Sequence, residues 1–183
     1  DEMKKVLFFG IYDPNYSRNS VLQSGFRGNG WLVGECRVDP RQVCGFKKYL
    51  ELFKKGLVCR REDWDLILVG FPGQVVVPIA KLLFLKRKIV FDAFVSFFDS
   101  NVYDRQKYLP FSLPAARDWF IDWLSTRLAD VVLLDTREHI KYFSQTFWIP
   151  LNKFIQVPVG SNPEFFFPVK PRKNPEFFTV HFH

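Results

Sequence analysis

Lys5-Val-Leu-Phe-Phe-Gly10 is an uninterrupted apolar run that ends in glycine, a pattern typical of a central strand covered on both faces. Five further strand-like segments follow at residues 31–38, 65–70, 88–95, 130–135 and 154–158. Helical spacing separates them at residues 18–29, 46–56, 113–129 and 136–145, with one more helix that ends near residue 85. This interpretation makes Gly56 a helix stop and pairs Asp135 with Glu138 in a capping box.

The regular alternation of strand and helix predicts an α/β fold, with a doubly wound, mostly parallel Rossmann-like sheet and helices on both faces. Ligands of such sheets bind beyond the carboxyl ends of the strands, where the strand order reverses. The loops that follow Gly10, Gly70 and Asp92 are therefore the first places to look for a site.

The composition describes a folded globular chain, because 48% of the 183 residues are hydrophobic and 25% are charged. Its net charge of +7 comes from scattered basic pairs without a nucleic-acid motif, so nucleic acid is not an expected partner. Anionic lipid headgroups or phosphorylated substrates remain open, and with them a peripheral membrane contact. The chain has no G-x-G-x-x-G motif, so no dinucleotide cofactor is expected.

Targeting signals and cysteines predict a cytoplasmic location. No apolar run approaches the roughly 18 residues that cross a bilayer, and the opening residues show no cleavable signal peptide. Cys36, Cys44 and Cys59 are an odd number in no metal-ligand spacing, so neither a disulfide framework nor a metal site is expected.

The loop after the first strand offers four candidate substrate-binding residues. Gly10 would let a substrate approach the backbone, with Tyr12, Arg18 and Asn19 reaching into the cleft. The structural alternative is a plain strand-to-helix turn with Arg18 on a solvated face.

The loops after the third and fourth strands offer five more. Gly73, in Phe71-Pro-Gly-Gln74, would form a backbone N–H nest for a phosphate or a sugar hydroxyl, although Pro-Gly also satisfies a turn without any ligand. Asp92, Asp99, Asp104 and Arg105 would hydrogen-bond sugar hydroxyls from the end of a strand and the polar loop beyond it. In the alternative, this is a solvated loop that Asp99 caps.

Several segments together resemble the amino-terminal domain of GT-B glycosyltransferases of the family-4 type. The matching pieces are Val6–Gly10 with Arg18-Asn19, and residues 30–33, 64–69, 129–138 and 157–168. The last of these, Val-Pro-Val-Gly-Ser-Asn-Pro-Glu-Phe-Phe-Phe-Pro, is similar to the family's linker between two domains. The order of the pieces spans nearly the whole chain.

The resemblance implies the acceptor-binding half of a retaining hexosyltransferase. Residues 1–160 would form this domain, 161–176 a proline-rich linker, and 177–183 the first strand of a second domain that binds the nucleotide-sugar donor. The acceptor would be a sugar or a lipid-linked molecule, and the chain alone would be inactive. Many family members place a histidine where this sequence has Phe94, so no catalytic residue is assigned.

A second hypothesis treats the chain as an engineered or truncated scaffold that binds a partner or itself. Leu32, Val58 and Leu109 are apolar where this pattern usually exposes polar residues. Apolar residues gathered on a surface mark association sites, so homo-oligomers are an open expectation.

Overall fold

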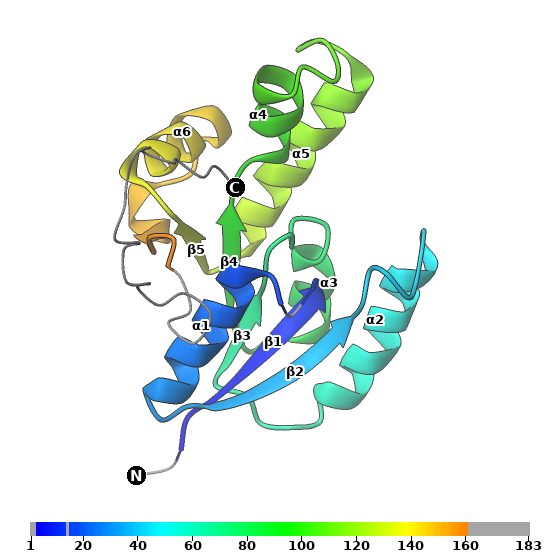
Figure 1. The fold of residues 1–183 in the computed structure, drawn as a ribbon, viewed down its shortest axis with the longest axis vertical. Coiled ribbons are helices and arrows are strands. Elements are labelled where there is room, and N and C mark those ends of the chain that lie inside the picture. The colour runs from blue at the N-terminus through cyan, green and yellow to red at the C-terminus, as the bar shows by residue number, and fades with distance from the viewer. Residues whose placement is uncertain (1–2, 14, 161–183) are drawn as a thin grey trace, which may run out of the picture.

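A computed structural model of the chain describes residues 3–13 and 15–160 (Figure 1). The strands are β1 (Lys5–Ile11), β2 (Leu32–Val38), β3 (Leu66–Val69), β4 (Lys88–Phe94), β5 (Val131–Leu134) and β6 (Phe154–Gln156). The helices are α1 (Ser17–Gly28), α2 (Lys47–Cys59), α3 (Val77–Leu83), α4 (Phe97–Asp99), α5 (Leu113–Leu128) and α6 (Arg137–Phe147), with a π-helical turn η1 (Ser100–Asp104) and a 3₁₀ turn η2 (Leu151–Lys153). The predicted linker 161–176 and tail 177–183 lie outside the described residues.

All six strands are parallel and lie in the order β2-β1-β3-β4-β5-β6, which confirms the predicted α/β fold. The chain runs outward from β1 to β2, and then crosses back to β3 and continues in the other direction. Strand order therefore reverses between β1 and β3, so the carboxyl ends of these two strands are where the fold leaves a crevice.

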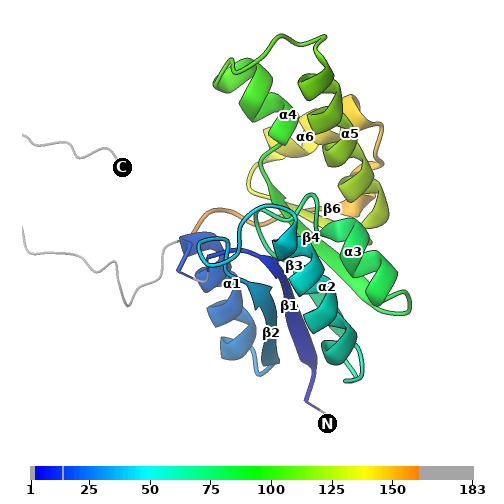
Figure 2. The same ribbon diagram turned by 90° about the vertical axis from the view of Figure 1, so that its right-hand side faces the viewer.

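Helices cover both faces of the sheet, as Figure 2 shows with α1 on one side and α2 and α3 on the other. Alternate residues of β1 supply both cores, because successive side chains of a strand point to opposite faces. Phe8 packs beneath Phe26 of α1, whereas Phe9 packs against Phe84 on the face that α2, α3 and α5 cover. Burying both rings explains the apolar run that opened the sequence.

Gly56 does not end a helix, contrary to the prediction. It lies buried inside α2, where an added Cβ would come within 2.5 Å of Leu83 Cδ1 and 3.1 Å of Phe9 Cε2. The residue is needed for the close approach of α2 to α3 and the sheet, and the helix continues to Cys59.

Two local details also differ from the sequence prediction. Thr136, not Asp135, caps α6, because its Oγ1 accepts a hydrogen bond from His139 N at 3.1 Å. The stretch after β4 is not simply a loop, since α4 and η1 form there and Ser96 caps α4 by accepting from Asp99 N. The alternative interpretation, in which Asp99 caps this segment, is therefore wrong, because Asp99 contributes its backbone N–H while Ser96 supplies the accepting oxygen.

Candidate functional site

Arg18 and Asp92 form a buried ion pair beneath the first turn of α1. Arg18 Nε and Nη2 donate to the two carboxylate oxygens of Asp92 at 2.7–2.9 Å, and Nη1 donates to Val157 O at 3.1 Å. The two side chains are only 4% and 0% exposed, so Arg18 does not lie on a solvated face. Burial raises the pKa of the Asp92 carboxyl, and the Arg18 guanidinium opposes that rise by stabilising the carboxylate. The structure brings the two predicted residues together, with each as the other's partner.

Phe94, at the end of β4, has an unusual backbone. Its φ is +57°, a region that bulky side chains rarely adopt, and the β4–β5 register shifts between Asp92 and Phe94. Packing holds it there, since the Arg18 guanidinium lies 4.7 Å from the ring centroid and the Phe71 ring lies 5.2 Å away. The strained residue thus ties β4 to the loop after β3.

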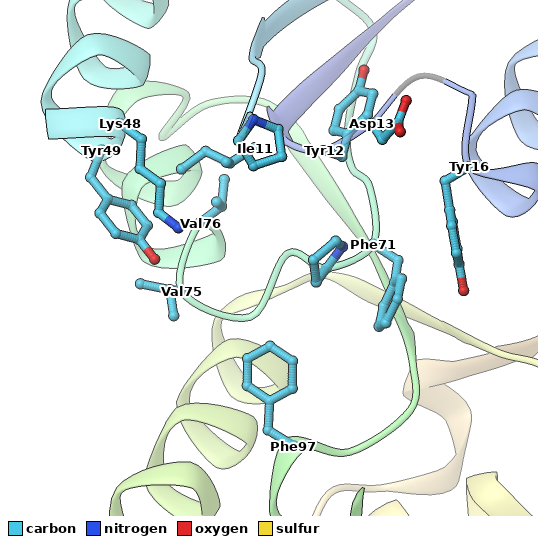
Figure 3. A pocket seen from close by; sticks show the side chains of 12 residues that line it. Ile11, Tyr12, Asp13, Tyr16, Lys48, Tyr49, Phe71, Val75, Val76 and Phe97 are labelled. Atoms are coloured by element: carbon cyan, nitrogen blue, oxygen red, sulfur yellow. The ribbon is translucent and has the colours of Figure 1, made fainter. Parts of the chain in front are cut away.

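Asn19 and Tyr12 are fully buried as well. Asn19 Nδ2 donates to Phe71 O at 2.8 Å, which fastens α1 to the loop after β3. Tyr12 points its hydroxyl away from Phe71 and Phe97 in Figure 3, and burial raises the pKa of that hydroxyl far above its ordinary value. An added Cβ on Gly10 would come within 3.0 Å of Tyr12 Cδ1. These predicted site residues hold the loops in place.

Gly73 is also enclosed by the chain itself. An added Cβ would come within 2.6 Å of Val69 Cγ1 and 2.7 Å of Gly70 O. The N–H groups of Val76 and Val77 donate to Gly73 O at 2.8 and 3.0 Å, so these two donors at the start of α3 are already used. The backbone N–H nest predicted at Gly73 is therefore a turn whose hydrogen bonds are made within the chain.

A cavity of about 350 Å³ opens at the carboxyl ends of β1 and β3, where the strand order reverses (Figure 3). We call it the aromatic cavity. It is lined by Ile11, Tyr12, Asp13, Tyr16, Pro40, Lys48, Tyr49, Phe71, Pro72, Val75, Val76 and Phe97. Its volume lies in the range of small-molecule sites, which are mostly apolar with a few convergent polar groups.

Lys48 and Tyr49 supply polar groups to the aromatic cavity from α2. Figure 3 shows both reaching in from α2 toward the loop that carries Val75. Lys48 has no ion-pair partner in the described part of the chain, and its ammonium lies 5.2 Å from the centroid of the Tyr49 ring. Asp13 instead pairs with Arg41. The cavity thus offers the Lys48 cation and the phenols of Tyr16 and Tyr49 among apolar side chains.

A second hollow of about 470 Å³ adjoins the aromatic cavity and shares Phe71, Val75 and Phe97 with it. We call it the basic depression, because Arg105, Lys107 and Arg117 line it. Of the residues predicted in the loop after β4, only Arg105 lines a hollow described here. Asp104 is exposed and Asp99 is half-buried in α4.

Asp118 provides the negative charge of the basic depression. Burial alone would raise the pKa of its carboxyl, but hydrogen bonds from Tyr108, Arg117 and Asn101 outweigh burial and lower that pKa. Asp118 is therefore an ionised carboxylate that pairs with Arg117. Two of the three cations, on Arg105 and Lys107, have no ion-pair partner among the described residues.

No protein-family model matches the chain, and no curated protein matches it either. In residues 3–13 and 15–160, no three His, Cys, Asp or Glu side chains gather as a metal ion would need. None of the helices in that same part has the length and apolar character that crossing a bilayer requires.

The aromatic lining escaped the sequence analysis. Tyr16, Phe71 and Phe97 each follow the end of a strand, after β1, β3 and β4 respectively. Large aromatic residues inside strands and long helices are most simply core, but Tyr16 and Phe71 stand in loops and Phe97 opens the short helix α4, all at the ligand-binding edge. That position in the sequence is the signal that would have found them.

Proposed function

We propose that the chain is the acceptor-binding domain of a nucleotide-sugar-dependent glycosyltransferase. The observation that carries this proposal is the aromatic cavity at the switch point between β1 and β3. The fold agrees with the one that the sequence resemblance implies.

The lining suits a sugar. The apolar faces of a pyranose ring pack against aromatic side chains such as Phe71, Phe97 and Tyr16. Its hydroxyl groups are hydrogen-bonded by Lys48 Nζ, which only donates, and by the Tyr49 hydroxyl, which donates or accepts. A few such polar groups in an apolar pocket fix the orientation of a ligand.

In this proposal the domain contributes binding and orientation. Holding the acceptor hydroxyl in a fixed place turns a bimolecular transfer into one that is effectively unimolecular. The nucleotide-sugar donor is bound by a second domain. The Arg18–Asp92 pair and Asn19 act indirectly, since they fasten α1, β4 and the loop after β3 around the cavity.

Saturation-transfer NMR with a panel of monosaccharides, disaccharides and alkyl glycosides tests this proposal. We expect at least one acceptor class to bind, and Tyr16→Ala and Lys48→Ala each to weaken it at least tenfold. The matched control is Arg60→Ala/Lys86→Ala, which removes two cations from a separate hollow formed by the end of α2 and the α3–β4 turn. If no glycoside binds, or if the control weakens binding equally, the proposal is wrong.

A cytoplasmic location belongs to the same proposal. Cys36, Cys44 and Cys59 are all free thiols, which fits a reducing compartment.

A self-associating or partner-binding scaffold is the second candidate. Leu32, Val58 and Leu109 are 46%, 64% and 77% exposed, as that hypothesis requires. Leu32 opens β2 at the amino edge of the sheet, whereas Leu109 lies beyond the carboxyl edge, so these two do not form one patch. Sedimentation velocity decides: a stable dimer that Leu32→Glu or Leu109→Glu dissociates would favour the scaffold.

A further inference from the structure

Three hollows of different chemistry meet at Val75. This residue lines the aromatic cavity and the basic depression, and it also lines a third hollow of about 540 Å³ between α2, α3 and α5. The third hollow shares Tyr49 with the aromatic cavity and Ile121 with the basic depression. Each hollow therefore adjoins the other two, and Val75 is their junction.

The third hollow, which we call the apolar groove, has a hydrocarbon lining. Leu50 and Phe53 of α2, Ile79 of α3, and Ile121 and Leu124 of α5 form its walls. Its amide side chain, Gln74, is buried, and its Nε2 donates to Val95 O at 2.9 Å. Leu50 is half exposed, so this apolar surface faces solvent. Covering it with hydrocarbon would remove apolar surface from water and would therefore be favourable.

The basic depression has the opposite character. Arg105, Lys107 and Arg117 face one carboxylate, Asp118, which leaves an excess of two positive charges. A phosphate monoester carries about −1.5 to −2 charges at neutral pH, and a phosphodiester carries one. Guanidinium and ammonium groups are the usual partners of phosphate oxygens.

We propose that the acceptor is a single amphiphile whose phosphate or pyrophosphate lies in the basic depression. Its hydrocarbon chain fills the apolar groove, and its sugar or hydroxyl-bearing headgroup enters the aromatic cavity. A phosphodiester carries two substituents, so a phosphate beside Val75 directs one substituent into each of the remaining hollows. This inference rests on the proposed function and narrows its acceptor to a lipid-linked molecule.

The adjacency of the hollows favours one amphiphile over a free sugar. A free sugar uses the aromatic cavity alone and leaves without a role both the apolar groove and Arg105 and Lys107, which have no ion-pair partner within residues 3–13 and 15–160. The groove's continuity with the aromatic cavity, through Tyr49 and Val75, places a hydrocarbon chain and a headgroup within one molecule.

Isothermal titration calorimetry of the full chain tests the proposal with three probes. These are decyl phosphate below its critical micelle concentration, inorganic phosphate, and decyltrimethylammonium as a chain of opposite charge. We expect decyl phosphate to bind at least tenfold more tightly than either of the others. Equal affinity for the two decyl compounds would overturn the role of the basic depression.

Variants then separate the two hollows. Leu50→Glu should weaken decyl phosphate at least tenfold and leave inorganic phosphate within twofold, while Arg105→Ala/Lys107→Ala should weaken both. Leu85→Glu, at an exposed leucine in the separate hollow beside Arg60 and Lys86, is the matched control and should change neither. Because a variant can fail to fold, Phe46→Glu at the exposed start of α2 repeats the groove test, with circular dichroism of each variant.

The outcomes distinguish this inference from the proposed function. If glycosides bind the aromatic cavity but Leu50→Glu and Phe46→Glu leave decyl phosphate unchanged, the amphiphile is wrong and the acceptor-binding proposal stands. If decyl phosphate binds as expected but no glycoside does, the amphiphile site stands and the glycosyltransferase role falls. If Leu50→Glu dissociates a dimer without changing decyl phosphate binding, the groove is an interface between copies and the inference is overturned.

Discussion

Beneath α1, Arg18 and Asp92 bond to each other and Asn19 bonds to a backbone oxygen, whereas around Val75 Lys48 and Arg105 line open hollows. Arg18, Asn19 and Asp92 are buried and bonded within the chain. Lys48 and Arg105 line hollows and have no ion-pair partner among the described residues. Buried polar groups therefore hold the loops in place, whereas the polar groups that line the hollows are available to bind a ligand.

The largest expected effect is on stability, at Asp92. Asp92→Asn leaves the buried Arg18 guanidinium without a countercharge, which should lower the free energy of unfolding by about 3–5 kcal/mol. Lys141→Ala, which breaks the exposed pair with Glu138, is the control and should cost less than about 0.5 kcal/mol. Urea denaturation measures both. A loss below about 1 kcal/mol for Asp92→Asn would mean that Arg18 finds another partner, and the comparison would fail.

Asp122 is a buried carboxyl that should make the stability of the fold depend on pH. It is fully buried in α5, accepts hydrogen bonds from Ser96 Oγ and Phe98 N, and so fixes the segment that carries Phe97. Burial raises the pKa of its carboxyl from an ordinary 3.8 to about 6. Between these pH values the folded chain binds more protons than the unfolded chain, so stability falls as the pH rises from about 4 to about 6.

The fall attributable to Asp122 should reach about 3 kcal/mol, since one pKa unit corresponds to about 1.4 kcal/mol. Asp122→Asn removes the titration. The measurement is the difference in unfolding free energy between wild type and variant at pH 4, 5, 6 and 7. The unfolding free energy of wild type minus that of the variant should decrease as the pH rises to about 6, and it should stay constant above that pH. A constant difference would show that Asp122 has an ordinary pKa.

Gly73→Ala should destabilise the chain by about 1–3 kcal/mol, because the new Cβ would meet the backbone oxygen of Gly70. Gly25→Ala is the matched control, since it lies in α1 with nothing within 4 Å of an added Cβ. That control should stabilise the chain by about 0.5–1 kcal/mol, as alanine is the better helix former. Equal melting temperatures for the two variants would show that the turn at Gly73 relaxes freely.

The smallest effect on stability is expected where the effect on binding is largest. Tyr16→Ala and Lys48→Ala should each change the free energy of unfolding by less than about 0.5 kcal/mol, as for ordinary surface positions. Thermal melts beside the glycoside titrations measure both properties. A large loss of stability in these variants would show that Tyr16 and Lys48 have a structural role and do not primarily bind a ligand.

The sheet was predictable from the sequence because continuous apolar runs such as residues 5–10 have few structures open to them other than buried parallel strands. Gly56 was misinterpreted because a helix stop and a close packing contact both select glycine, and only the position of Leu83 distinguishes them. The capping residue of α6 was displaced by one position, since Asp135 and Thr136 are both good caps.

The site was less predictable because its contacts join distant parts of the chain. Nothing near Arg18 in the sequence shows that Asp92, 74 positions away, is its partner. Arg105 was expected at the cleft and does line the basic depression, since it lies in the long segment after β4. Lys48 stands in no recognisable motif, and only the packing of α2 beside the loop after β3 places it at the aromatic cavity.

The central claim is that ligands bind at the junction around Val75, and the methyl NMR signals of that residue test it most directly. We expect titration with decyl phosphate, or with a glycoside that binds, to shift the Val75 methyl signals saturably. The methyl signals of Leu85, beside the separate hollow, should stay in place. Saturable binding that leaves Val75 unshifted, or that shifts Leu85 equally, would contradict the account.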